Sequence, residues 1–188
     1  ECFKSDNGQK KCFTESDCIE RDGEYCMKFN NTDGVVGRGR DLATVMFTRR
    51  INEDDVEGCW ELDIRGGHTT WATVAAIPNV NEANPIREVK PRSCDGQQAR
   101  SEKSIFNGVY GRMDDVLLLS QAFDDKADTT HFGPPVGTEL LGFSSGGDDA
   151  GFLWAKKFTS RGDTGELSTT GPGTKARCKD ALLSVVVK

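Results

Sequence analysis

This sequence is poor in histidine and in long apolar runs and lacks an excess of positive charge, and each of these absences excludes a class of protein. Its two histidines, His68 and His131, lie far apart and form no His-x-x-x-His pair, so no compact zinc site is expected. No apolar run approaches the ~18 residues of a membrane span. The net charge is −6, which leaves no basic surface to neutralise phosphates and argues against nucleic acid as a partner.

Helical periodicity is also missing. No segment keeps an apolar stripe of period 3.6 over four turns. Short apolar, β-branched and aromatic runs recur instead, separated by clusters of Gly, Asp, Asn and Pro that favour turns. The predicted strands are 44–51, 59–64, 70–77, 104–110, 116–123, 139–143, 151–158 and 181–187. This pattern predicts an all-β fold, an antiparallel β-sandwich or barrel.

Cysteine is abundant, with seven residues, and four of them lie near the start of the chain. The residues between these four are too polar to form a core, so disulfides are expected to stabilise the segment, and disulfides persist outside the reducing cytosol. The spacings lack the short Cys-x2-4-Cys repeats of structural zinc sites. We therefore expect a secreted, extracellular protein with a disulfide-rich N-terminal extension, residues 1–33, before a β-sandwich domain, residues 34–188. The odd count leaves one cysteine over, as a buried free thiol or as an intermolecular link. The pairing is open among Cys2, Cys12, Cys18, Cys26, Cys59, Cys94 and Cys178.

Two short motifs bear on modification and catalysis. Asn30 begins an Asn-Asn-Thr sequon, which predicts a glycoprotein in an extracellular setting. Residues 142–146 match the Gly-x-Ser-x-Gly pattern of hydrolases, but no histidine follows His131 to complete a triad. A glycine-serine turn is the favoured interpretation, so we predict no catalytic residue and no enzymatic activity.

Charged motifs in predicted turns suggest weaker hypotheses. Asp114 and Asp115 are candidate ligands for Ca²⁺, although solvated turn carboxylates are the default interpretation. Arg161, Gly162 and Asp163 form an RGD tripeptide in a predicted hairpin turn, where an adhesive role through an integrin competes with a simple turn.

Aromatic residues are the candidates for ligand binding. By period-two alternation Trp71 shares a strand face with threonines, which favours a platform for a sugar ring, with His68 beside it. Trp60 lies in the preceding predicted strand. Burial in the core is the competing interpretation for both tryptophans.

The order of these pieces resembles a DOMON-type domain. The similar segments are Lys11-Cys12-Phe13 with Cys18 and Cys26, then 59–64 with 70–74, then Gly111-Arg112-Met113-Asp114-Asp115-Val116, and finally 152–158 with 180–183. The resemblance implies a secreted, non-enzymatic β-sandwich that binds a ligand, often a carbohydrate, or a protein partner, with no cofactor expected. Its alternatives are a haem-binding redox domain with Met113 and His131 as axial ligands, and an extracellular structural or adhesive component.

Overall fold

The computed structural model describes residues 26–29, 33–38, 43–48, 62–65, 72–81, 83–92, 103–124, 127–146, 149–172 and 180–188. The regular structure of these residues consists of strands, with no helix among them. Every pair of strands with a defined register is antiparallel. The predicted all-β, antiparallel class is therefore confirmed.

The chain divides into two compact units, residues 1–36 with 45–70 and residues 37–44 with 71–188. In the first unit β1 (Cys26–Phe29) pairs with β4 (Leu62–Arg65). Strands β2 (Asp33–Arg38) and β3 (Ala43–Thr48) form a further two-stranded sheet. The domain boundary predicted at residue 33 stays a prediction.

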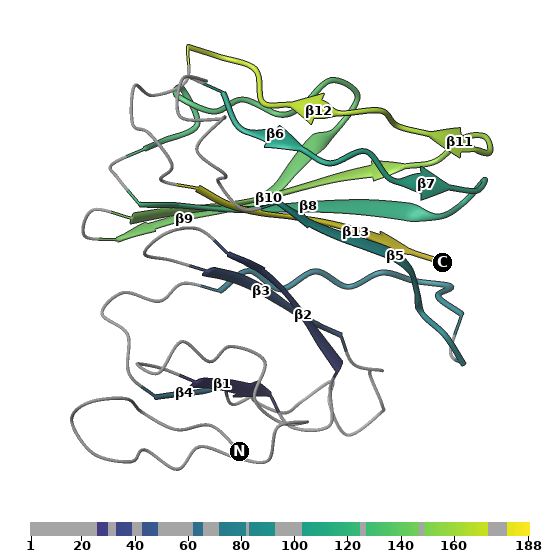
Figure 1. Cartoon of the computed structure of the whole chain (residues 1–188), viewed down its shortest axis with the longest axis horizontal. Helices are drawn as coiled ribbons and strands as arrows, with labels where there is room; N and C mark the ends of the chain where they lie inside the picture. The colour runs from purple at the N-terminus through teal and green to yellow at the C-terminus, as the bar shows by residue number, and fades with distance from the viewer. Residues whose placement is uncertain are drawn as a thin grey trace. The chain divides into compact units, whose positions relative to one another are not determined.

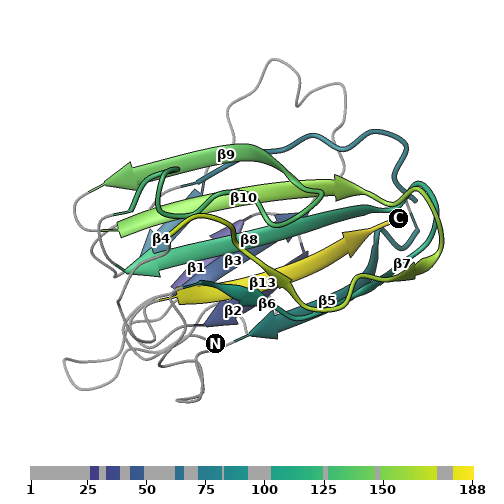
Figure 2. The same ribbon diagram turned by 90° about the horizontal axis from the view of Figure 1, so that it is seen from above.

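The second unit is built on a five-stranded sheet with the order β5-β13-β8-β10-β9 (Figures 1 and 2). Its strands are β5 (Ile86–Arg92), β13 (Asp180–Val187), β8 (Val116–Asp124), β10 (Asp149–Lys157) and β9 (Glu139–Gly146). The three inner strands are almost entirely buried, whereas β5 and β9 form the two edges.

Two short ladders lie over one face of this sheet (Figure 1). One pairs β6 (Ile105–Phe106) with β12 (Leu167–Ser168), and the other pairs β7 (Tyr110–Gly111) with β11 (Gly162–Asp163). The core lies between the ladders and the sheet, where the rings of Phe106 and Trp154 meet edge to face at 5.8 Å. Burial of such aromatic side chains supplies much of the stability of a core.

The opposite face of the sheet is buried as well. Leu118, Leu153, Leu183 and Val185 alternate with the core residues along their strands and have little or no exposed surface. On this face the hydroxyls of Thr44 and Ser120 are 2.5 Å apart. Because both faces are covered, the inner strands show the near-continuous apolar runs that the sequence displays.

Several local predictions were wrong. Residues 72–77 are irregular and mostly exposed rather than a strand, although most of their side chains are apolar. The strand predicted at 104–110 breaks into β6 and β7. A Cβ atom at Gly108 would lie 2.6 Å from the Gly165 carbonyl oxygen, so this close approach requires a glycine. Strand β5 was not predicted, because charged residues and a proline interrupt its apolar pattern.

Candidate binding surface on strand β9

Strand β9 and the turn before it expose large apolar side chains. Val136 is 75% exposed, Leu140 38%, Leu141 44% and Phe143 37%. We call these four residues the β9 surface. Three of these side chains lie on the edge strand and Val136 lies in the turn three residues before it, so four exposed apolar side chains fall within eight consecutive residues. Groups of this kind mark interaction sites, whereas single exposed apolar residues are ordinary.

A β-bulge shapes this strand. Leu153 is opposite Gly142 and Trp154 is opposite Leu140, so Leu141 is an extra residue with no partner on β10. A bulge bends an edge strand and interrupts its ladder, which turns one side chain away from the regular alternation. Leu141 is the most exposed of the apolar residues within β9 as a result.

Phe143 and Val136 of the β9 surface are fixed in place by contacts within the fold. The Phe143 ring packs on Phe152 at 5.0 Å, and Phe152 stacks on Trp154 at 5.2 Å, so Phe143 extends the aromatic core outward. Val136 is in a turn where the N–H and hydroxyl of Thr138 both donate to the Pro135 carbonyl oxygen, at 3.0 and 2.8 Å. Surfaces that are ordered before binding lose less conformational entropy when a partner arrives.

One cation borders the β9 surface. Lys156 lies on β10, on the same face as Trp154 by strand alternation. A Cβ atom built on Gly137 would lie 3.4 Å from the Lys156 Nζ atom, which places the ammonium group beside the turn that carries Val136. Among the described residues Lys156 forms no ion pair, whereas the neighbouring Lys157 pairs with Asp114 at 2.8 Å.

The two predicted calcium ligands are both paired with cations. Asp115 is buried and accepts hydrogen bonds from Arg87 at 2.5 and 3.1 Å and from the Arg112 N–H at 2.8 Å. Burial acts to raise the pKa of Asp115, but these hydrogen bonds outweigh it and the pKa is lowered. Asp114 pairs with Lys157 on the surface. Within the described part of the chain, no three acidic, histidine or cysteine side chains gather as they would around a metal ion.

The structure does not bring the predicted haem ligands together. Met113 precedes the first residue of β8, a nine-residue strand that spans roughly 30 Å. His131 adjoins Phe132, whose ring packs at 4.9 Å on Phe123 near the last residue of that strand. His131 lies in a turn, where its N–H donates to the Asp128 carbonyl at 3.0 Å.

The RGD tripeptide lies partly in a bend and partly in a strand, with Arg161 in the bend that precedes β11. Gly162 and Asp163 form β11, and the turn follows them, where the Asp163 carboxylate accepts the Gly165 N–H at 2.7 Å. Arg161 is exposed but hydrogen-bonds to the Tyr110 hydroxyl and lies 5.5 Å from its ring centre. The side chains of Arg161 and Asp163 thus have local structural partners.

Residues 142–146 form the second half of β9 instead of the glycine-serine turn that was predicted. Strand β10 follows them, so the strand-to-helix turn that a hydrolase serine needs is not formed here. The predicted ligand-binding, glycosylation and disulfide positions lie outside the described residues, except for the backbone of Cys26 in β1. They are Trp60, His68, Trp71, Asn30, Cys2, Cys12, Cys18, Cys59, Cys94 and Cys178.

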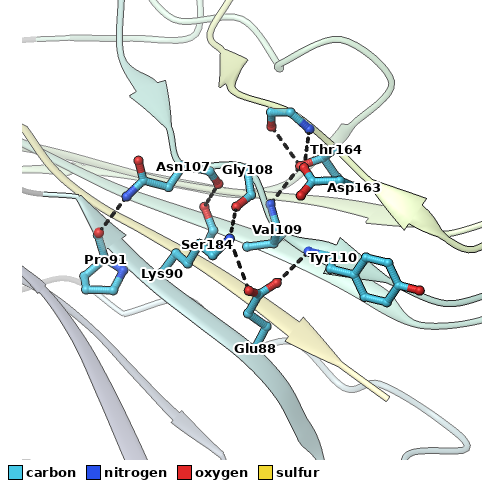
Figure 3. A network of polar contacts seen from close by, with 11 residues as sticks. Glu88, Lys90, Pro91, Asn107, Gly108, Val109, Tyr110, Asp163, Thr164 and Ser184 are labelled. Atoms are coloured by element: carbon cyan, nitrogen blue, oxygen red, sulfur yellow. Dashed lines mark hydrogen bonds and ion pairs between the residues drawn. The ribbon is translucent and has the colours of Figure 1, made fainter.

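A second polar group of residues lies at the other edge of the sheet (Figure 3). On β5 the Glu88 carboxylate accepts the Tyr110 N–H at 2.5 Å and pairs with Lys90 at 3.1 Å. Lys90 also donates to the Gly108 carbonyl at 2.7 Å. These charged side chains satisfy backbone groups of residues 107–110, where the path between β6 and β7 is irregular.

A polar cluster is also enclosed beside the core. Ser104 donates its N–H to Thr169 at 3.1 Å, and its hydroxyl accepts from Gln121 at 2.5 Å. Burial raises the pKa of Asp180, and a hydrogen bond with Ser104 opposes that rise. Two buried atoms of this region, Gln121 Oε1 and Trp154 Nε1, have no hydrogen-bond partner among the residues that the structure describes. The cluster connects β8, β12 and β13 and is not open to a partner.

Comparisons with models of protein families, with curated proteins and with solved structures found no match to this chain. No helix in the described residues is long and apolar enough to cross a membrane. The β9 surface is therefore identified as a candidate binding site by the exposure and arrangement of its side chains.

Proposed function

We propose that this protein is a secreted, non-enzymatic β-sandwich of DOMON-like type that binds a protein partner through the β9 surface. The two short ladders packed on the five-stranded sheet support the sandwich. A disulfide-stabilised N-terminal extension and glycosylation at Asn30 belong to the same proposal, because both fit a protein that works outside the cell.

The observation that carries this proposal is the exposed apolar patch of Val136, Leu140, Leu141 and Phe143. The inner strands of the same sheet bury nearly every apolar side chain, so the patch is a local departure and not a general property of the fold. An edge strand that presents apolar side chains is the usual receptor for an extended segment of another protein.

Selection from a library of random displayed peptides tests the function. The wild type and a Val136→Ser, Leu141→Ser variant are immobilised in parallel, and each selected peptide is measured against both. We expect peptides that bind the wild type and lose at least tenfold in affinity for the variant, since two apolar contacts are removed. A selection that yields no binder, or binders that do not distinguish the two proteins, would overturn the proposed function.

A further inference from the structure

The cation beside the β9 surface indicates what its partner carries. Lys156 is half-buried, and its ammonium group lies beside the turn that carries Val136. Among the described residues it has no carboxylate partner, although the chain contains 30 acidic residues and 24 basic ones. An unpaired cation at the border of an apolar patch favours a ligand that combines apolar side chains with a negative charge.

We propose that the β9 surface binds an extended peptide segment whose apolar side chains cover Leu140 and Phe143 and whose carboxylate pairs with Lys156. This inference rests on the proposed function and names the chemistry of the partner. By strand alternation and ring contact, Leu140, Phe143 and Lys156 lie on one face of the sheet, so a single segment running along β9 meets all three.

The position of Lys156 predicts which end of the bound peptide segment carries the carboxylate. Ala155 is opposite Glu139, the first residue of β9, so Lys156 lies at the start of that strand and the exposed Phe143 lies further along it. The carboxylate of the partner is therefore expected at the end of the segment nearest Glu139, with its apolar side chains toward Phe143. The Glu139 side chain, next to Leu140 in the strand, alternates to the other face and leaves this position open.

The test uses the peptides selected on the wild-type chain, measured by titration calorimetry against matched variants. Lys156→Met should weaken binding about five- to tenfold and remove its dependence on salt, because a partly buried ion pair is lost. Lys156→Arg should keep both the affinity and its dependence on salt, because the positive charge is retained. The control is Lys157→Met, a change on the same strand but on the opposite face, which should leave the affinity unchanged.

A charge exchange separates a direct pair from a general effect of charge. Replacing the acidic residue of a selected peptide by Lys should weaken binding to the wild type and restore it to Lys156→Glu. Selected peptides without an acidic residue, or with equal affinity for Lys156→Met, would overturn this inference while leaving the proposed function intact. Sedimentation should show a monomer. A dimer that dissociates in the Val136→Ser, Leu141→Ser variant would overturn the peptide proposal in favour of a second copy.

Discussion

The two edge strands of the five-stranded sheet differ in how their side chains are used. Strand β5 carries Arg87, Glu88 and Lys90, each with a hydrogen bond or ion pair to a segment outside the sheet, and a proline at residue 91. Strand β9 carries two exposed leucines and a phenylalanine, with a bulge as its only irregularity. Charges and proline are the usual protection of an edge against pairing with another chain.

This contrast suggests that the two edges serve different purposes. The polar side chains of β5 satisfy backbone groups of the adjacent irregular segment, so their removal should cost stability. Leu141 on β9 and Val136 before it are the most exposed side chains of the β9 surface, so their removal should cost little stability and should mainly affect binding. Four predictions test this difference between the two edge strands, in order of decreasing effect on the free energy of unfolding.

Arg87→Ala should cause the largest loss, about 3 kcal/mol of the free energy of unfolding. Within the described part of the chain, the change leaves the buried carboxylate of Asp115 with the Arg112 N–H as its one remaining hydrogen-bond partner. Urea denaturation of both proteins at neutral pH measures the difference. Lys157→Ala is the control, because it breaks an exposed ion pair with Asp114 and should cost less than ~1 kcal/mol. Equal losses in the two variants would contradict the role assigned to Arg87.

The same pair predicts a dependence on pH. The pKa of Asp115 is lowered from 3.8 in the folded protein, so the unfolded chain takes up its proton first as the pH falls. The contribution of Asp115 to the free energy of unfolding is complete above its ordinary pKa and is lost as the pH falls below that value. In Arg87→Ala the carboxylate of Asp115 keeps its burial but loses the hydrogen bonds from Arg87. The pKa of Asp115 in the folded variant should therefore rise. The stability gap between the two proteins should therefore be widest near neutral pH and should narrow at pH 4 and below, in denaturation series across that range. A constant gap would argue against the ion pair.

Glu88→Ala should have an intermediate effect, about 1–2 kcal/mol. It leaves the Tyr110 N–H without its acceptor and removes the ion pair of Lys90. Glu88→Gln keeps an oxygen acceptor for the N–H and should recover part of the loss. Denaturation of both variants checks this, and a Gln variant no more stable than the Ala variant would show that the N–H bond is not the main contribution.

Much of the sheet could be predicted from the sequence, for a reason visible in its inner strands. Val116 to Phe123 and Ala181 to Val187 are near-continuous apolar runs, which are typical of a strand buried on both faces, and both form strands. Strand β5 escaped prediction because its polar side chains bond to backbone groups around Gly108 and Tyr110, a relation that depends on tertiary structure.

The candidate site was harder to predict. The sequence places Leu140 and Leu141 in a strand but does not show that this strand is an edge or that it contains a bulge. Lys156 carried no signal at all, because a lysine at the end of a strand is ordinary. The polar and small residues Glu139, Gly142, Ser144 and Ser145, which interrupt the apolar residues of this strand, were the one available hint that the strand is only partly buried.

Leu141→Ser should have the smallest effect on stability, within about 0.5 kcal/mol. Leu141 is the bulged residue of β9 and 44% exposed, so the change removes little apolar surface that folding buries. Thermal and urea denaturation should barely distinguish the variant from the wild type, whereas Leu119→Ala in the core should cost about 2–5 kcal/mol. A loss above ~1 kcal/mol for Leu141→Ser would mean that the side chain is covered within the chain itself. In that case the two edges would both contribute to stability, and the β9 surface would not be available to a partner.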